Sequence, residues 1–395
     1  MSRGRLDVVN PGVVFTRDPQ AARIIQQALE KSSSLRASFI EQDITGALRN
    51  IGALSGAGFV ILDVSQVDDP LTVFSGIVDV LPPSIPVVVI GDTNDIRLYR
   101  SLINAGAAEY FFRPLVGDLI AGTLNKILLD SQVKGNPRQG KLIHFIGVRG
   151  GAGVTSIALR TAKLLSDSPP RPVFLMDMNL LSSDMATQVN LQPSGAIFEA
   201  LENAERIDDL FLERTLAKVS ENLDLMSTLN PLNQPVRMSE PSLLTLFGKL
   251  AERYRYLVTE VPNTSVTDLS QVIRLGSTIV LVSDGRLASA RDVARWRELL
   301  SSAANGVTLV HVLNRFDQPD ALPMDQFARL AGTLPDISIP YSRGVAEASL
   351  LGLSGREGFE EMDAALTPLV AMIAGSSGAH AADQRSWLDR ILRRK

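Results

Sequence analysis

Short, continuous runs of apolar residues recur along the chain and alternate with segments that have helical periodicity. β-Branched residues are frequent in these runs and turn-forming residues bound them, so each run predicts a strand. Strands that are apolar throughout are typical of a parallel sheet covered on both faces. In the first third of the chain the strand candidates are 12–16, 59–65, 85–92 and 108–112, and the helix candidates are 19–31 and 95–105.

A polar stretch at 131–140, SQVKGNPRQG, interrupts this pattern, and its glycines and proline predict a linker. The alternation then restarts, with further strand candidates at 141–148, 172–178, 223–228, 256–261, 278–284 and 307–314. Strand–helix alternation on both sides of the linker predicts two doubly wound α/β domains. We assign them to residues 1–130 and 141–375, followed by a flexible segment and a tail at 376–395.

The composition excludes several kinds of site. The 395-residue chain has no cysteine and three histidines, which excludes disulfides, thiolate metal sites and a cysteine nucleophile. Its formal net charge of −4 argues against a general nucleic-acid-binding surface. No apolar run is long enough to span a bilayer and the first residues lack an apolar signal core, which predicts a cytoplasmic protein.

The segment with the clearest chemistry is FIGVRGGAGVTSIALRTAKLL, residues 145–165. An apolar strand candidate leads into the glycine-rich turn GGAG at 150–153, and a helix candidate begins at Val154. Backbone N–H groups at such a turn converge on one point, where the helix dipole adds partial positive charge that suits a phosphate group. Thr155 is placed to help hold Mg²⁺, but Val154 stands where a phosphate loop usually carries a lysine. From spacing alone, the alternative is a tight strand-to-helix turn that binds nothing.

The segment GVRGGAGVTS resembles the deviant Walker A loop of the MinD/ParA family, which carries lysines before the paired glycines and before the threonine. Arg149 and Val154 occupy those two positions in this chain. The resemblance implies an ATP site. Its nucleotide-binding residues would be Arg149, Gly150, Gly151, Ala152, Gly153, Val154, Thr155 and Ser156.

Other segments of the second predicted domain are also similar to that family. LMDMNLLSSDMATQVNL looks like its second strand and switch I, with Asp177 at the strand end and Asp184 in the switch. YLVTEVP looks like its Walker B strand, with Glu260 where an aspartate is usual, and VLNRFD places Asn314 near the adenine base. The resemblance implies that Thr155, Asp177 and, through water, Glu260 hold Mg²⁺, and that Asp184 and Glu260 have weak catalytic roles.

The departures from the family pattern affect the chemistry that we expect. Val154 brings no charge to the phosphates, and loss of such a charge is expected to lower the rate of phosphoryl transfer by roughly 10²-fold or more. We therefore expect ATP and Mg²⁺ to bind through backbone amides, with slow hydrolysis or none, and to stabilise a homodimer. The alternatives are an inactive scaffold and a working ATPase that positions another cargo.

The first predicted domain resembles a response-regulator receiver, with Asp63 where a receiver carries its phosphoacceptor. A phosphoacceptor needs a neighbouring acidic pair for Mg²⁺ and a lysine beside the phosphoryl group. This chain has Thr16 in place of one acid, Gly91 in place of a hydroxyl residue and Arg113 in place of the lysine. We therefore predict a receiver-like interaction domain that is not phosphorylated, with a phosphorylatable regulator as the alternative.

The order of the two domains resembles that of the TadZ/CpaE group of Flp (Tad) pilus assembly proteins. The resemblance implies an assembly factor that places the pilus secretion machinery at the inner membrane, at the cell pole. The partners would be the pilus secretion ATPase and inner-membrane platform proteins.

The last residues of the chain form a basic, amphipathic pattern. On a helical wheel, one sector contains the apolar side chains of Trp387, Leu388, Ile391 and Leu392, with most charges opposite. A basic amphipathic helix with tryptophan predicts contact with an anionic membrane surface. A helix that docks on a partner protein and a solvated tail are the alternatives.

Overall fold

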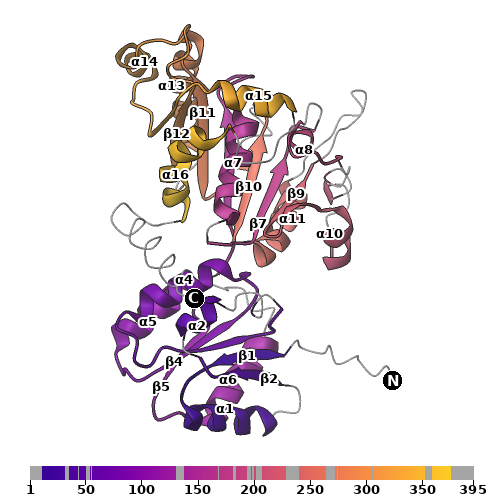
Figure 1. The fold of residues 1–395 in the computed structure, drawn as a ribbon, viewed down its shortest axis with the longest axis vertical. Helices are drawn as coiled ribbons and strands as arrows, with labels where there is room; N and C mark the ends of the chain where they lie inside the picture. The colour runs from indigo at the N-terminus through magenta and orange to yellow at the C-terminus, as the bar shows by residue number, and fades with distance from the viewer. Residues whose placement is uncertain are drawn as a thin grey trace. The chain divides into compact units, whose positions relative to one another are not determined.

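The computed structural model describes residues 11–374 apart from 32–34, 43, 50–53, 55, 130–137, 168, 181–183, 194–196, 198–199, 202–206, 228–239, 264–271, 274, 304–306 and 352–357. Contacts between residues divide the described chain into two units, one ending at Gln139 and the other beginning at Gly140. In Figure 1 the first unit runs from indigo to purple and the second from magenta to yellow.

The first unit is built on a five-stranded parallel sheet with the flavodoxin-like order β2-β1-β3-β4-β5. Its strands are β1 (Gly12–Phe15), β2 (Ala37–Ile40), β3 (Val60–Asp63), β4 (Val87–Gly91) and β5 (Glu109–Phe112). The sequence patterns predict all of these except β2. This strand lies at the edge of the sheet and none of its residues is fully buried, so it lacks the continuous apolar run that marks the others.

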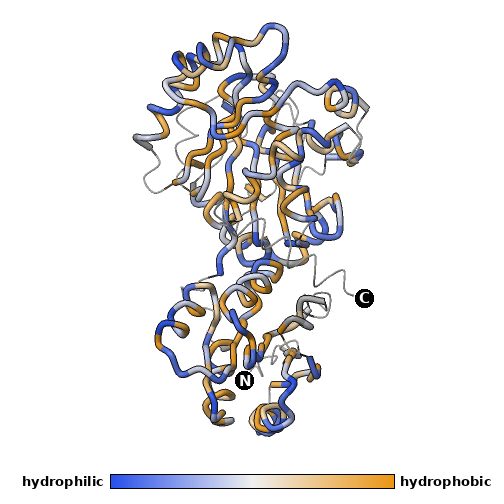
Figure 2. The backbone as a smooth tube through the Cα atoms, turned by 60° about the vertical axis from the view of Figure 1, so that its left-hand side comes forward, coloured by the Kyte–Doolittle hydropathy of each residue, from blue (hydrophilic) through white to orange (hydrophobic). Residues whose placement is uncertain are grey.

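Helices cover both faces of this sheet: α1 (Pro19–Lys31), α2 (Ile44–Arg49), α4 (Pro70–Val80), α5 (Ile96–Asn104) and α6 (Gly117–Leu129). Alternate residues of a strand point to opposite faces, so Val13 and Phe15 pack into the core beneath α2, α4 and α5, and Val14 into the core beneath α1 and α6. Figure 2 shows hydrophobic residues concentrated on the interior strands. The prediction of a doubly wound α/β fold is confirmed for this unit.

The second unit is built on an eight-stranded sheet in the order β13-β12-β11-β6-β10-β7-β9-β8. Its strands are β6 (Lys141–Gly147), β7 (Val173–Asp177), β8 (Ala217–Ser220), β9 (Leu223–Met226), β10 (Tyr256–Val261), β11 (Thr278–Asp284), β12 (Thr308–Asn314) and β13 (Ile337–Ile339). The six predicted strands are all present. The sheet adds the short edge strands β8 and β13, and β8 pairs antiparallel with β9, so the sheet is mixed.

The helices of the second unit are α7 (Val154–Asp167), α8 (Met185–Gln188), α10 (Asp209–Thr215), α11 (Glu240–Arg253), α13 (Leu287–Ala303), α14 (Met324–Ala331), α15 (Arg343–Leu351) and α16 (Glu360–Ala374). Side chains of α11, α13 and α14 form the core on one face of the sheet, and those of α7 and α16 form the core on the other. The parallel strands β6, β7, β10, β11 and β12 end at one edge of the sheet. Ligands of open α/β sheets bind at this edge, where the loops after the strands meet.

The end of the predicted linker is packed against the first unit. Arg138 is buried, and its guanidinium donates hydrogen bonds to the backbone carbonyls of Ile85, Val78 and Leu81, at 2.5, 3.2 and 3.1 Å. Gly106 has a φ of 107°, and a Cβ there would lie 2.4 Å from Arg138 Cγ. The last residues of the predicted linker thus belong to the first unit, because one arginine hydrogen-bonds several carbonyls in and after α4.

Two buried histidines lie within the second sheet. His144 Nδ1 lies 2.6 Å from Thr259 Oγ1, and His311 Nε2 lies 2.8 Å from Ser283 Oγ. Burial lowers the pKa of His311 to about 4, while Asp336 raises it and Arg297 lowers it by smaller amounts. Burial also lowers the pKa of His144, so both histidines are neutral core residues.

We expect the stability of the second unit to fall as pH drops from about 6.5 towards 4. In this range the unfolded chain protonates His311 and the folded chain does not, so the unfolded state binds more protons and gains stability. One histidine with this shift accounts for up to about 3 kcal/mol. Urea unfolding of the wild type and of His311→Gln at several pH values measures it, and equal pH slopes would contradict the assignment.

Candidate nucleotide-binding site

The glycine-rich loop lies between the end of β6 and the start of α7. Gly151 and Gly153 have φ values of 78° and 91°, a left-handed conformation that side chains with a Cβ rarely adopt. A Cβ on Gly153 would also lie 2.3 Å from Asn314 Nδ2. Glycine is therefore required at position 153 for two separate reasons, and the loop adopts the compact turn that the sequence predicts.

Two acidic side chains stand beside the loop at the ends of neighbouring strands. Glu260 of β10 and Asp177 of β7 are paired in register, and both are buried. Thr155 Oγ1 donates a hydrogen bond of 3.0 Å to Glu260 Oε1, whereas Glu260 Oε2 is buried without a hydrogen-bond partner among the described residues. Burial and the charge of Asp177 raise the pKa of Glu260 to about 8, and the hydrogen bond from Thr155 opposes this shift.

These residues fit a magnesium–nucleotide complex. A buried carboxylate oxygen without a partner, a second carboxylate and a hydroxyl are the oxygen ligands that Mg²⁺ prefers, and the glycine turn suits phosphate. No group of three or more His, Asp or Glu side chains able to hold a metal is found in the described part of the chain. A magnesium ion held by Thr155 and Asp177, and through water by Glu260, would therefore complete its shell with further water and phosphate oxygens.

Asp184 is connected to the loop helix through a short polar chain. It precedes α8, where its carboxylate accepts a hydrogen bond of 3.1 Å from Gln188 Nε2. Ser156 Oγ of α7 donates in turn to Gln188 Oε1 at 3.4 Å. The charge of Asp184 also contributes to the raised pKa of Glu260, so the structure brings Asp184 into the electrostatic surroundings of the acidic pair.

The two positions where the family carries lysines have different surroundings here. Arg149 is exposed, and its Nη1 lies 2.9 Å from Asp292 Oδ2 on α13. Val154, the first residue of α7, packs against the core formed by α7 and α16, and a Cβ on Gly147 would lie 2.7 Å from its Cγ2. The position of the loop lysine is thus part of the hydrophobic packing, and the cation at 149 is held by a surface pair of the kind that costs little to break.

Three further side chains that sequence reasoning missed hold the loop from the protein side. Asn263 Nδ2 donates to the Gly147 carbonyl at 3.0 Å, Trp296 Nε1 to the Val148 carbonyl at 3.3 Å, and Arg315 Nη2 to the Gly151 carbonyl at 2.6 Å. Of these three residues, only Arg315 could have been suspected from the sequence, because it directly follows Asn314, which the resemblance places at the site. Asn314 is buried and donates to the Ala152 carbonyl at 2.8 Å, and its contact with an adenine base stays a prediction.

Comparison with known proteins shows which solved structures have a fold similar to that of the second unit. No family model matches the chain, and no curated protein matches it. Among solved structures, it is similar to a ParA family ATPase from Chlorobium tepidum, with a TM-score of 0.50 and 19% identity. The match covers 64% of this chain and 98% of that one.

The second unit has the fold of a ParA-family ATPase. Two further matches are MinD of Pyrococcus horikoshii with Mg-ADP (TM-score 0.49, 14% identity, 62% of this chain and 98% of that one) and a plasmid partition protein of Borrelia burgdorferi with AMPPNP (0.47, 17%, 60% and 98%). The predicted fold class is confirmed, with a second α/β sheet that precedes the ParA-like one.

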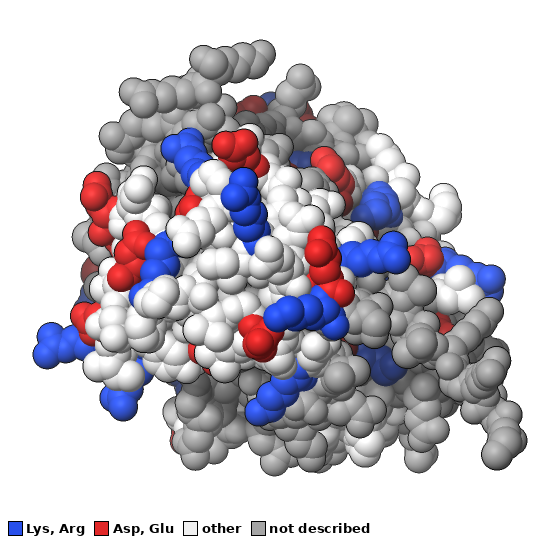
Figure 3. Space-filling view, turned by 90° about the horizontal axis from the view of Figure 1, so that it is seen from below, with Lys and Arg blue, Asp and Glu red and all other residues white. Residues whose placement is uncertain are grey.

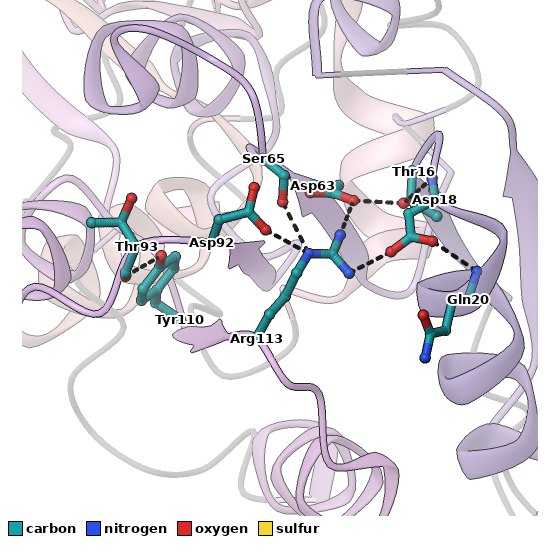
Figure 4. Close-up of polar contacts among 9 residues, drawn as sticks. All are labelled: Thr16, Asp18, Gln20, Asp63, Ser65, Asp92, Thr93, Tyr110 and Arg113. Atoms are coloured by element: carbon teal, nitrogen blue, oxygen red, sulfur yellow. Dashed lines mark hydrogen bonds and ion pairs between the residues drawn. The ribbon is translucent and has the colours of Figure 1, made fainter.

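A separate polar cluster lies at the carboxyl edge of the first sheet (Figure 4). The Arg113 guanidinium lies between three carboxylates, at 2.5 Å from Asp18 Oδ2, 2.9 Å from Asp63 Oδ2 and 2.7 Å from Asp92 Oδ1. Thr16 Oγ1 also donates to Asp63 Oδ2 at 2.6 Å. The positive charge among these carboxylates is therefore the guanidinium of Arg113, and Asp63 is one of the carboxylates that pair with it.

The remaining contacts of Asp63 and the surroundings of Gly91 complete this cluster. The backbone N–H of Ser65 donates to Asp63 Oδ1 at 3.0 Å, so both carboxylate oxygens of Asp63 accept hydrogen bonds. A Cβ on Gly91 would lie 2.8 Å from the hydroxyl of Tyr110, which donates to the Thr93 carbonyl. Tyr110 thus occupies the space that a side chain at position 91 would need.

Replacing Arg113 by glutamine is expected to destabilise the first unit by about 2–4 kcal/mol, because it leaves clustered carboxylates without their cation. Adding Asp63→Asn should recover part of the loss.

On the face shown in Figure 3, exposed charges of both signs are interspersed, and pairs of this kind contribute less than about 1 kcal/mol. Lys31→Gln, which breaks an exposed pair with Asp118, is the control, and equal shifts in urea unfolding would contradict the prediction.

The predicted membrane contacts Trp387, Leu388, Ile391 and Leu392 lie outside the described residues. Among the residues that are described, no helix has both the length and the apolar character needed to cross a bilayer.

Proposed function

We propose that the second unit binds ATP with Mg²⁺ at the loop formed by residues 149–156 and hydrolyses it slowly or not at all. The observation that carries this proposal is the buried Oε2 atom of Glu260, which has no partner among the described residues and stands beside Thr155 and a loop with two left-handed glycines. A polar atom this deeply buried is costly unless a ligand engages it.

Each residue of the site has a defined part in binding. The N–H groups of the loop and of the first turn of α7 donate hydrogen bonds to phosphate oxygens, and the α7 dipole favours the negative charge of the phosphates. Thr155, Asp177 and, through water, Glu260 hold Mg²⁺, which when bound neutralises phosphate charge. Asp184 orients water, and Asn314 contributes to the base side. Val154 and the surface-paired Arg149 leave little positive charge for the transition state, so hydrolysis is weak.

The direct test is titration calorimetry of the full chain with Mg-ATP, combined with a turnover assay. We expect measurable binding, a rise in melting temperature with Mg-ATP, and turnover well below that of a lysine-containing loop. Absence of both a heat of binding and a thermal shift would contradict nucleotide binding and favour an inactive scaffold. Rapid turnover would favour a working ATPase that cycles between monomer and dimer.

At the level of the cell, we propose an assembly factor of the TadZ/CpaE kind that positions the Flp (Tad) pilus secretion machinery at the inner membrane, at the cell pole. A flavodoxin-like sheet preceding a ParA-like sheet supports this, together with the motifs that resemble that group. Its partners would be a second copy of the chain, the pilus secretion ATPase and inner-membrane platform proteins. Fluorescent fusions that stay diffuse, and pili that form normally without the protein, would contradict it.

Two parts of this proposal have their own tests. Nucleotide-linked dimerisation is measured by ultracentrifugation with and without Mg-ATP. Contact with the membrane through the tail is measured by flotation with anionic vesicles, where deletion of 387–395 should abolish binding. A dimer doubles the number of tails and strengthens binding through effective concentration.

For the first unit we propose an interaction domain that is not phosphorylated. The guanidinium of Arg113 and the hydroxyl of Thr16 engage Asp63, which supports this assignment. Incubation with acetyl phosphate is expected to give no label. Labelling that disappears in Asp63→Asn would instead favour a phosphorylatable regulator.

A further inference from the structure

The phosphate loop is held from its protein side by two consecutive residues at the end of β12. Asn314 Nδ2 donates to the Ala152 carbonyl at 2.8 Å, and Arg315 Nη2 donates to the Gly151 carbonyl at 2.6 Å. These two carbonyls belong to successive peptide groups of the loop. Their anchoring therefore fixes the orientation of two peptide planes together.

The orientation of these planes determines where the loop N–H groups point. In a trans peptide the C=O and N–H bonds point in opposite directions, so a carbonyl held on one side sends the following N–H to the other side. The N–H groups of Ala152 and Gly153 thus face away from Asn314 and Arg315. Left-handed φ values at Gly151 and Gly153, on either side of Ala152, give the kind of turn whose N–H groups form an anion-binding concavity.

Arg315 itself is held in an unusual state. Its φ is 53°, a left-handed value that costs a residue with a Cβ about 1–2 kcal/mol. Its Nη2 lies 3.8 Å from Asp284 Oδ2, and its Nε is buried without a hydrogen-bond partner among the described residues. The side chain is nevertheless fixed against the loop. The permanent positive charge of Arg315 therefore lies next to the Gly151 peptide. That peptide belongs to the phosphate loop, in which Val154 occupies the position of the usual lysine.

We propose that Arg315 is a positioning residue for the polyphosphate of the bound nucleotide, an inference that rests on the proposed ATP site. It acts through the Gly151 carbonyl, which it holds so that the next N–H faces the phosphates. Its guanidinium adds positive potential behind the loop and replaces part of the charge that a lysine at position 154 would supply. The ligand class that this arrangement favours is a nucleoside di- or triphosphate, because the contact is with the phosphate loop and not with the base.

The test is calorimetry of the full chain with Mg-ATP at about 50 and about 300 mM salt, since salt screens a charge contribution and leaves neutral hydrogen bonds largely unchanged. Arg315→Gln can keep a donor but loses the charge, so we expect affinity about ten-fold weaker and a shallower salt dependence. Arg315→Lys keeps the charge and should restore the salt dependence. A merely structural role would not make the salt dependence follow the charge in this way.

Arg286→Gln is the matched control. Arg286 also contacts Asp284, at 3.2 Å, but it pairs with Asp320 as well and, within the described part of the chain, makes no hydrogen bond or ion pair with the loop. We expect the affinity and salt dependence of this variant to equal those of the wild type. Should Arg315→Gln not fold, Arg315→Lys takes its place, with affinity about three-fold weaker because the planar fork is lost.

The outcomes separate this inference from the proposed function. If the wild type binds Mg-ATP and the folded Arg315 variants match it in affinity and salt dependence, the inference is overturned and the ATP site stands. If the wild type does not bind Mg-ATP, the proposed function fails and the inference fails with it.

Discussion

Gly153→Ala is expected to weaken Mg-ATP binding at least about 100-fold, the largest effect of any single substitution in the loop. Two costs combine at this position. The φ of 91° is unfavourable for alanine, and the new Cβ would lie 2.3 Å from Asn314 Nδ2, which is buried and anchors the Ala152 carbonyl. Relief of this overlap requires Asn314 to move, so the loop loses that anchor.

Two other glycines serve as graded controls for this prediction. Gly151 also has a left-handed φ, but a Cβ there meets nothing within 4 Å, so Gly151→Ala measures strain without the steric overlap. Gly248 lies in α11 with open space around it, and its replacement by alanine should stabilise the helix slightly without changing affinity. Calorimetry should rank the losses as 153, then 151, then 248. Wild-type affinity in a folded Gly153→Ala protein would contradict the assigned loop conformation.

Asp363→Ala is expected to lower the free energy of unfolding of the second unit by about 3–5 kcal/mol. Asp363 of α16 accepts two hydrogen bonds from the buried guanidinium of Arg160 on α7, at 2.8 Å from Nε and 2.5 Å from Nη2. The same guanidinium stacks 4.5 Å from the ring centroid of Phe359. Removal of the carboxylate takes away two charge-assisted hydrogen bonds from a cation that is only 3% exposed, so the cost far exceeds that of a surface pair.

The controls for this prediction separate charge pairing from helix-end effects. Glu361 also lies in the first turn of α16 but is exposed, so Glu361→Ala tests the interaction of an acidic residue with the helix dipole alone. The double variant Arg160→Met/Asp363→Leu removes both charges and should recover most of the lost stability. Urea unfolding measures all three. An Asp363→Ala protein no less stable than Glu361→Ala would show that the pair contributes little.

Much of the fold could be predicted because buried strands require continuous runs of apolar residues, which can be recognised locally in the sequence. Central strands such as β4 and β11 contain continuous apolar runs, VVVI and IVLV, since helices cover both of their faces. The edge strands β2, β8 and β13 were not predicted, because they are short and partly exposed. No local sequence pattern distinguishes such a strand from a loop. Whether the segment is a strand depends on its hydrogen-bonded pairing with a neighbouring strand.

The candidate site divides in the same way. The glycines and Thr155 were identified from the local pattern, because the chemistry of a phosphate loop depends on neighbours a few residues away. Asp177 and Glu260 were identified only through the resemblance to the MinD/ParA family, and the pairing of β7 with β10 brings them together. Asn263 and Trp296 were not, because each contacts the loop from a distant part of the chain and through a single hydrogen bond. Arg113 was noted only as a departure from a pattern, and its place between three carboxylates comes from the convergence of strand ends.

By itself, the sequence determined the alternation of the central strands with helices, the position of the glycine-rich turn and the absence of a lysine at position 154. These properties depend on local backbone preferences and on the spacing of apolar residues. Only the tertiary structure decided which side chains support that turn and which cation the carboxylates of the first unit engage. The reason is that parallel strands bring their carboxyl ends together from distant parts of the chain, so the partners of each polar group are set by sheet order and not by sequence distance.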